Sequence, residues 1–351
     1  MESEIGISKF KNIDGVTCYM NSILAILQQI PILCDYLISN NYRSLLKDDN
    51  YNEKIIYQLH KLFRISMSMN NANLTPYTLR KVCADKDFTW GERQQQDSSE
   101  FLQFIITKVE EEIGSKVKFI PGLTNKEISF TNSLKIIQSQ IEYQTFVKNE
   151  FSPFKTFFTG LENTQLTCKT CLTDKSKYET FSIWQLPIPV SKDNMKKEFD
   201  IKECMEKWIE KEVLDDKLTC DFCGLKSKVS KKCSIFNPPK VLVIQLKRFE
   251  RNNYGNLTNK LNNKVNFPIN NLDISDYVSN PILKKENCLY NLMAVNLHYG
   301  VANSGHYYSV VKNRSDNLWY VFNDDDTPVK VNKISEIVDY KAYLLFYYKV
   351  T

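Results

Sequence analysis

The segment Thr17-Cys18-Tyr19-Met20-Asn21-Ser22 places a cysteine at the start of the first helix that the sequence predicts. The apolar residues from Ile23 to Ile30 recur at helical spacing, and Pro31 ends the segment. Unpaired backbone N–H groups and the positive end of the helix dipole both favour a thiolate in this position. Cys18 is therefore a candidate nucleophile, although most single cysteines are buried and inert.

Helices dominate the pattern up to about residue 115, and strands dominate it from about residue 150. A second amphipathic helix is predicted from Asp97 onward. Helices first and strands later indicate an α+β fold with a largely antiparallel sheet. The predicted strands are Lys240–Phe249, Leu289–Leu297, Tyr307–Val311, Leu318–Phe322 and Ala342–Tyr348.

The composition is that of an ordinary globular protein. Its 351 residues carry 46 basic and 41 acidic side chains, and no Lys/Arg run concentrates the net charge of +5. The first ten residues lack a signal-peptide core, and no stretch approaches the roughly 18 apolar residues that span a bilayer. We therefore expect an intracellular protein, in the cytoplasm or nucleus, that binds neither nucleic acid nor membranes and whose ten cysteines are reduced.

Three histidines are the candidates for a general base beside the thiol. His60 lies in a helical stretch and is interpreted as structural, whereas His298 ends one predicted strand and His306 begins the next. We choose His306, because a base works best where a third group fixes its tautomer. The strand Trp319–Phe322 runs into Asn323-Asp324-Asp325-Asp326 and could supply that group, although acidic runs are usually solvated turns.

Two Cys-x-x-Cys pairs predict a metal site, Cys168 with Cys171 and Cys220 with Cys223. Two such turns can direct four thiolates at one tetrahedral zinc ion. The 48 residues between the pairs exceed the usual short-ribbon spacing, so redox-active or incidental pairs remain an alternative. Since all four positions are filled, we expect one structural zinc ion per chain.

Five segments in order identify a family: Gly15–Ser22, Gln95–Leu102, Val241–Phe249, Gly305–Tyr307 and Trp319–Asp324. Together they resemble the ubiquitin-specific proteases, with similarity from about residue 6 to residue 348. Several motifs in one order along a whole chain are far more specific than any single motif.

This resemblance implies a papain-like cysteine protease fold, with a helical thumb, a palm formed by an antiparallel sheet, and zinc-ribbon fingers that hold ubiquitin. It implies a single catalytic domain over residues 1–351. The thumb would extend to about residue 115, and the fingers and palm would occupy about 116–351, with the zinc ribbon within 160–235.

The resemblance also implies the roles of the active-site residues. Cys18 is the nucleophile, and His306 is the general base and then the general acid. Asn323, directly after the aromatic residue, orients His306; some members carry Asp there. Asp324 is the acidic neighbour that supports the site.

One departure from the family pattern concerns the oxyanion loop. The family has Asn five residues before the cysteine, where this chain has Ile13, and Asn12 lies six before it. Either the loop bulges and Asn12 still reaches the site, or the backbone N–H of Cys18 provides most of the stabilisation. Loss of one such donor typically lowers the rate by about 10²–10³.

Asp97 and Glu100 permit two interpretations. Asp-x-x-Glu before an apolar pair is typical of a helix cap, with Asp97 as N-cap. The resemblance instead places both carboxylates and Gln95 beside the arginine-rich ubiquitin tail, where charge-assisted pairing gives directional recognition. His298 and Tyr307 are assigned with them to substrate binding.

The expected function is a monomeric thiol hydrolase that removes ubiquitin from ubiquitinated proteins through an acyl-enzyme thioester. Two alternatives share the fold: a weak or inactive ubiquitin-binding module, and a protease for another ubiquitin-like modifier. A zinc-ribbon nucleic-acid binder is a distant third, because no basic stripe accompanies the cysteines.

Overall fold

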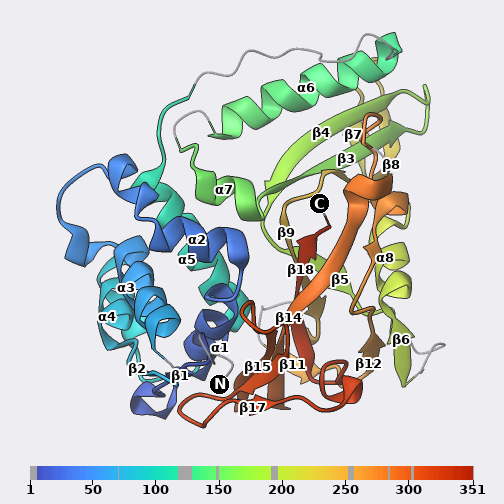
Figure 1. Ribbon diagram of the computed structural model, residues 1–351. Helices are drawn as coiled ribbons and strands as arrows, with labels where there is room; N and C mark the ends of the chain where they lie inside the picture. The colour runs from blue at the N-terminus through green and yellow to red at the C-terminus, as the bar shows by residue number, and fades with distance from the viewer. Residues whose placement is uncertain are drawn as a thin grey trace.

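The computed structural model describes residues 6–69, 71–117, 129–147, 150–190, 197–251, 257–283, 285–301 and 304–350. Helices lie on one side, a large sheet occupies the middle, and a second sheet projects from it (Figure 1). These parts are the expected thumb, palm and fingers, so the predicted α+β papain-like fold is confirmed.

The first two thumb helices begin at residues that the sequence analysis singled out. α1 starts at Cys18, and Pro31 is the first residue of α2, so that proline begins a helix as well as ending one. The α-helices of this lobe are α1 Cys18–Leu27, α2 Pro31–Ile38, α3 Ile55–Ser68, α4 Tyr77–Lys86 and α5 Ser98–Ile113. Helix α7, Pro153–Phe158, lies beyond the expected limit near residue 115 and packs against α2 and α5. Short 3-10 turns include η1 Ile13–Gly15, η2 Asn41–Leu45, η3 Tyr51–Glu53 and η4 Phe88–Gly91, and β1 Lys9–Phe10 pairs with β2 Asn73–Leu74.

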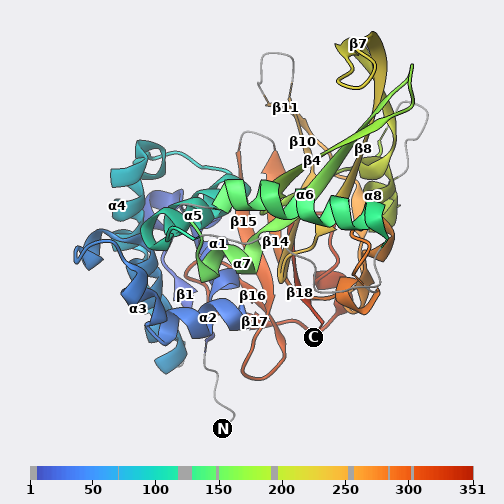
Figure 2. The same ribbon diagram turned by 90° about the horizontal axis from the view of Figure 1, so that it is seen from above.

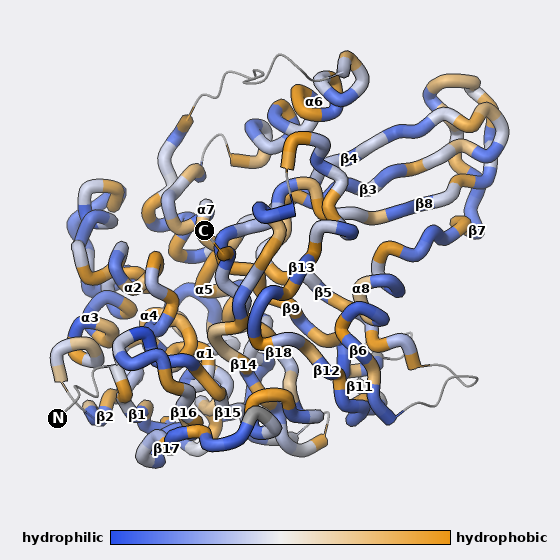
Figure 3. Tube along the Cα trace, turned by 45° about the vertical axis from the view of Figure 1, so that its right-hand side comes forward, coloured by the Kyte–Doolittle hydropathy of each residue, from blue (hydrophilic) through white to orange (hydrophobic). Residues whose placement is uncertain are grey.

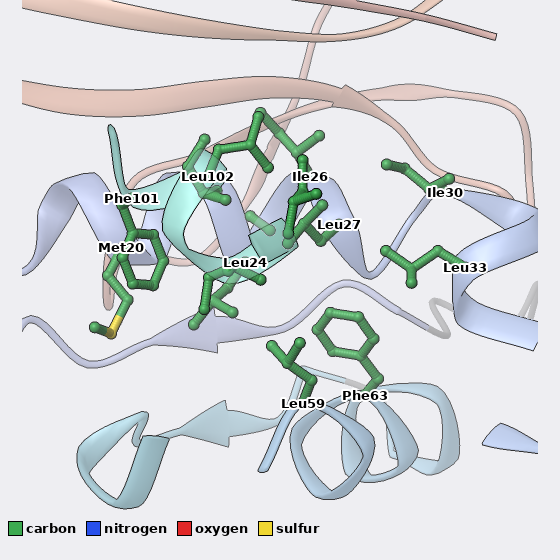
Figure 4. Packing of buried hydrophobic residues seen from close by; sticks show 14 of the residues in the cluster. Met20, Leu24, Ile26, Leu27, Ile30, Leu33, Leu59, Phe63, Phe101 and Leu102 are labelled. Carbon is green, nitrogen blue, oxygen red and sulfur yellow. The ribbon is translucent and has the colours of Figure 1, made fainter. Parts of the chain in front are cut away.

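The central helix α1 is buried along its whole length. It packs between α5 and the palm strands β14 and β15, an arrangement visible in Figure 2. On its other side, Leu59 and Phe63 of α3 lie across from Leu24 and Leu27 (Figure 4). Burial on all sides holds the N-terminus of α1 at a defined position against the sheet.

In the described part of the chain, the palm is an eight-stranded sheet of order β17-β16-β15-β14-β18-β9-β5, with β13 paired to β14. All its pairs are antiparallel except that between β5 and β9. The bounds are β5 Trp184–Pro187, β9 Val241–Lys247, β13 Leu272–Asp273, β14 Leu289–Val301, β15 Ser304–Lys312, β16 Trp319–Phe322, β17 Val329–Lys330 and β18 Ala342–Lys349. The five predicted strands are therefore all present.

Both faces of the palm sheet are covered. Val241 and Val243 of β9 contact the thumb core, whereas the alternating Leu242 and Ile244 join a second core that includes Ile201 of helix α8. Because a strand buried on both faces has no polar alternation, β9 begins with four consecutive apolar residues, Val241–Ile244. Helix α8, Ile201–Ile209, begins with a complete capping box formed by Asp200 and Glu203.

The fingers are a four-stranded sheet of order β4-β3-β8-β7. Its strands are β3 Gly160–Cys168, β4 Asp174–Phe181, β7 Glu212–Thr219 and β8 Lys226–Asn237. Hydrophilic residues recur along β3, β4 and β8 (Figure 3), and the associated buried cluster is small. Helix α6, Phe130–Val147, lies along the β4 edge, where Glu142 accepts a hydrogen bond from the Tyr178 N–H at 2.6 Å.

The remaining elements connect these layers. They are β6 Glu198–Asp200, paired with β12 Lys264–Asn266; β10 Phe249–Arg251, paired with β11 Leu257–Lys260; and the 3-10 turns η5 Ser275–Tyr277, η6 Lys285–Cys288 and η7 Ile334–Glu336. Among the described residues, no single helix is long and apolar enough to cross a membrane; α1 and α2 meet that criterion only as a pair bent by 88°.

Candidate active site

Cys18 is the first residue of α1 and is 1% exposed. The first N–H groups of a helix have no acceptor within the helix, and together with the helix dipole they stabilise negative charge there. Cys18 therefore lies at the start of the first helix, as the sequence predicts.

The loop before Cys18, which has one residue more than the family pattern, forms a bulge with two residues in the left-handed region. Asp14 has φ 55° and Gly15 has φ 71°, next to each other in η1. Asp14 accepts a hydrogen bond from Arg80 at 2.9 Å, which lowers the pKa of the Asp14 carboxyl. The buried Arg80 also donates to the carbonyls of Trp90 and Glu92, so it anchors the bulge to the thumb.

Asn12 links this loop to the far end of the chain. Its Oδ1 accepts from the Thr17 N–H at 2.9 Å, and its Nδ2 donates to Asp324 Oδ2 at 2.7 Å. The Asn12 amide thus joins the loop before Cys18 to Asp324, and the oxyanion role assigned to Asn12 stays a prediction.

His306 lies on β15, next to Cys18, because β15 packs against α1. The pKa of His306 is raised to about 9, mainly by a hydrogen bond with the Cys18 thiol. Burial lowers this pKa, and the hydrogen bond with Asn323 raises it further. Since Nε2 is 2.6 Å from Asn323 Oδ1, Nδ1 is left for the thiol. The imidazole of His306 thus bonds to the Cys18 thiol on one side and to the Asn323 amide on the other.

The neighbours Asn323 and Asp324 point in different directions because β16 ends at Phe322 and Asp324 is left-handed, with φ 49°. Asn323 bonds to His306, whereas Asp324 accepts from Asn12 and, at 2.7 Å, from Asn21 Nδ2. Asp324 Oδ2 also lies 3.9 Å from His306 Nε2, without a hydrogen bond. Burial is the largest cause that raises the pKa of Asp324. The structure thus brings together Cys18, His306, Asn323, Asp324 and Asn12.

Asp97 is the N-cap of α5, as predicted. Its Oδ1 accepts from the N–H groups of Ser99 at 2.7 Å and Glu100 at 3.2 Å. Its Oδ2 accepts from the Tyr343 hydroxyl at 2.7 Å. Both oxygens therefore have partners within the protein, one in the thumb and one in the palm.

The other residues assigned to substrate binding lie in different places, with Glu100 in a groove and Gln95 against the turn before His306. Gln95 Oε1 accepts from the Gly305 N–H at 2.9 Å, which connects the thumb to the turn before His306. Glu100 lines a groove of about 730 Å³, together with Asp97, Lys247 and Tyr343. This groove passes between thumb and palm.

His298 and Tyr307 pair across β14 and β15, with ring centroids 4.6 Å apart. Both side chains are buried, and burial is the main cause that lowers the pKa of His298 to about 3, so its ring is neutral. Gly305 packs so tightly on His298 that a Cβ at residue 305 would lie 2.2 Å from Nε2. His298 packs on Phe249 and Tyr307 packs on Tyr343, two residues that line the groove. The assignment of His298 and Tyr307 to substrate binding stays a prediction.

The four fingertip cysteines form a cluster that could hold a metal ion. Their sulfurs all lie within 4.8 Å of one another, and those of Cys171 and Cys220 are 3.7 Å apart. A zinc ion bound tetrahedrally at about 2.3 Å places sulfurs about 3.8 Å apart, so the cluster fits zinc. The Thr170 N–H donates to Cys168 Sγ at 3.4 Å, as expected of a turn that stabilises thiolates.

Several residues of the site could not be identified from their local pattern. Asn21 lies within the quoted Cys18 segment, which was its only signal. Arg80 and Tyr343 have no motif, and Asp326 was part of an acidic run. Asp326 accepts a hydrogen bond from Asn323 Nδ2 at 2.6 Å.

The helical lobe carries the cysteine, and the sheet on which it packs carries the histidine and the asparagine. Papain-like cysteine proteases have this arrangement. The profile of the family described as "Ubiquitin carboxyl-terminal hydrolase" matches residues 9–347. The chain therefore belongs to the ubiquitin carboxyl-terminal hydrolase family.

Named relatives agree with this assignment. The chain is 30% identical to "Ubiquitin carboxyl-terminal hydrolase Usp2" of Drosophila melanogaster, covering 99% of this chain and 35% of that protein. It is 29% identical to human "Ubiquitin carboxyl-terminal hydrolase 2", covering 99% and 56%. The chain thus spans between about a third and just over half of these relatives.

Solved structures show the same fold. The "SAGA Ubp8/Sgf11/Sus1/Sgf73 DUB module bound to ubiquitin aldehyde" contains a chain that matches with a TM-score of 0.76 and 26% identity. The match covers 100% of this chain and 71% of that one.

Proposed function

We propose that this chain is a thiol hydrolase that cleaves the amide bond after the C-terminal glycine of ubiquitin on conjugates. The observation that carries the proposal is the alignment of Cys18, His306 and Asn323, in which one hydrogen-bonded row joins thiol, imidazole and amide. Asp324 and Asn12 act as supports, through the bonds that hold the loop before Cys18.

The proposed reaction begins with attack of the Cys18 thiolate on the carbonyl carbon of the glycine. The backbone N–H at the start of α1 stabilises the negative charge that develops on the carbonyl oxygen. His306, held by Asn323, gives its proton to the departing amine, and a thioester remains. His306 then takes a proton from water, whose oxygen attacks the thioester and releases ubiquitin and the free thiol.

Ubiquitin is the partner we propose, because two matching structures are described as bound to ubiquitin aldehyde and to monoubiquitin. The groove lined by Glu100 and Asp97 would receive its tail, with Gln95, Tyr307 and His298 shaping the end near His306. The matching Ubp8 chains are in assemblies with other subunits, so the monomeric state of this chain stays a prediction.

The proposed zinc ion would be held by Cys168, Cys171, Cys220 and Cys223. When bound, it would supply a structural cross-link between the two turns of the fingertip. The location in the cytoplasm or nucleus and the domain limits within residues 1–351 also stay predictions.

The test is a ubiquitin probe with a C-terminal electrophile. We expect one covalent adduct, located at Cys18 by mass spectrometry. Cys18→Ala should lower kcat/KM on a ubiquitin–fluorophore amide by at least about 10⁴-fold, as removal of a nucleophile does in other proteases. Cys233→Ser, at a half-buried cysteine of β8, is the control and should leave labelling and turnover unchanged.

Two outcomes would contradict the proposal. A Cys18→Ala variant with wild-type turnover would exclude this nucleophile. A wild-type protein that binds ubiquitin but forms no adduct would favour the ubiquitin-binding module of the same fold.

A further inference from the structure

The turn after β16 contains a carboxylate that contacts the amide next to His306. The backbone N–H of Asp326 donates to the Asn323 carbonyl at 3.0 Å and closes the turn. The Asp326 side chain accepts from Asn323 Nδ2 at 2.6 Å, while Asn323 Oδ1 lies 2.6 Å from His306 Nε2. The Asn323 amide is thus held at both ends.

The two ends of an amide are not equivalent. Oδ1 can only accept and Nδ2 can only donate, so a reversed amide would present N–H groups to the N–H of His306. It would also present an oxygen to the Asp326 carboxylate, which only accepts when ionised. Asp326 therefore selects the orientation in which Oδ1 faces His306.

The three consecutive carboxylates of this run have different surroundings. Asp324 turns inward to Asn12 and Asn21. Asp325 is exposed, and Asp326 is exposed but bonded to Asn323. The contact with Asn323 thus distinguishes Asp326 from a neighbour of the same charge.

We propose, on the basis of the function proposed above, that Asp326 is a positioning residue that orients the Asn323 amide and makes asparagine the compatible residue at that position. The substitution Asn323→Asp would place a carboxylate oxygen where Nδ2 now lies, against Asp326. Two carboxylates at such a separation repel unless one of them binds a proton. If Asp326→Asn were added, the introduced carboxylate could accept from His306 on one side and from the introduced amide on the other.

The test exchanges the two side chains. At pH 8, Asn323→Asp should lower kcat/KM on a ubiquitin–fluorophore amide by about 10–100-fold, because the orienting group is repelled from its place. The double variant Asn323→Asp with Asp326→Asn should recover to within about threefold of wild type, since the bond is restored with reversed polarity. The matched control is Asn323→Asp with Asp325→Asn, which removes the same charge one residue earlier and should not recover.

A second measurement needs no turnover. The chain has three histidines, so ¹⁵N-histidine NMR resolves their ring nitrogens. In wild type, His306 should carry a slowly exchanging proton on Nε2. Asp326→Ala should speed the exchange of that proton at least about tenfold, as loss of one orienting bond allows, whereas Asp325→Ala should not.

The outcomes separate this inference from the proposed function. A wild type that cleaves no ubiquitin amide contradicts the function, and a change in His306 exchange confined to Asp326→Ala would still support the positioning role. A fully active Asn323→Asp variant, equal recovery with Asp325→Asn, or unchanged His306 exchange in Asp326→Ala would each overturn the inference.

Discussion

Cys18 and the four fingertip cysteines carry the same side chain in opposite surroundings. Cys18 is buried at the start of a buried helix, and its neighbours His306 and Asn323 lie some 300 residues further along the chain. The fingertip sulfurs come from two short turns, each held by its own backbone bonds. The position of Cys18 depends on the tertiary fold, whereas the four fingertip thiols are brought together by two local turns.

The two regions also differ in what stabilises them. Thumb and palm share two large buried clusters, one on each face of the palm sheet. In the fingers, β7 is exposed at all but one of its positions, and the buried cluster is small. A sheet with so little apolar burial depends on another source of stability, and a bound ion can supply it.

The largest expected effect is that of removing the metal ion, which tests whether the fingers depend on it for stability. Cys220→Ala should reduce bound zinc from about one ion per chain to nearly none, since structural zinc sites contribute roughly 10–16 kcal/mol of apparent binding energy. Metal analysis measures the ion, and hydrogen exchange should show lost protection in β7 and β8 but not in α1. One zinc ion retained in Cys220→Ala would contradict the assignment, and Cys233→Ser is the control.

The second effect concerns pH. The pKa of His306 is raised to about 9, so the imidazolium persists through neutral pH and loses its proton only as the pH rises through that value. We expect kcat/KM to fall above about pH 9, as the group that protonates the leaving amine is lost. In Cys18→Ala, where the main cause is removed, NMR titration should show a lower pKa for His306. An unchanged pKa would mean that the thiol does not govern it.

The smallest effect concerns the junction of thumb and palm. Asp97→Ala should lower the free energy of unfolding by about 0.5–2 kcal/mol, because it removes the cap of α5. Glu100→Gln, one turn away in the same groove, should leave stability unchanged and raise KM instead. Denaturant unfolding and KM for a ubiquitin substrate separate the two roles. Equal loss of stability in both variants would contradict this division.

The local sequence pattern was sufficient to predict the features that a few adjacent residues determine. The start of α1 at Cys18, the cap at Asp97 and the paired Cys-x-x-Cys turns are all of this kind. The complete capping box is at Asp200 and Glu203, which the sequence analysis did not single out.

The remaining features depend on contacts that no local pattern encodes. The direction of Asn323 relative to Asp324 depends on where β16 ends and on one left-handed residue. Arg80 reaches the bulge from a different helix, and Tyr343 reaches Asp97 from the last palm strand. Side-chain partners of this kind become visible only when distant segments are placed together in space.

The bonds of Asp324 have a consequence for synthesis of the chain. Its backbone carbonyl accepts from the Phe10 N–H, and its carboxylate accepts from Asn12 and Asn21. The loop before the thiol is translated early in the described fold, whereas the residue that secures it is translated among the last. A nascent chain therefore lacks the residue that secures the loop before Cys18 until nearly all of the described fold has been translated.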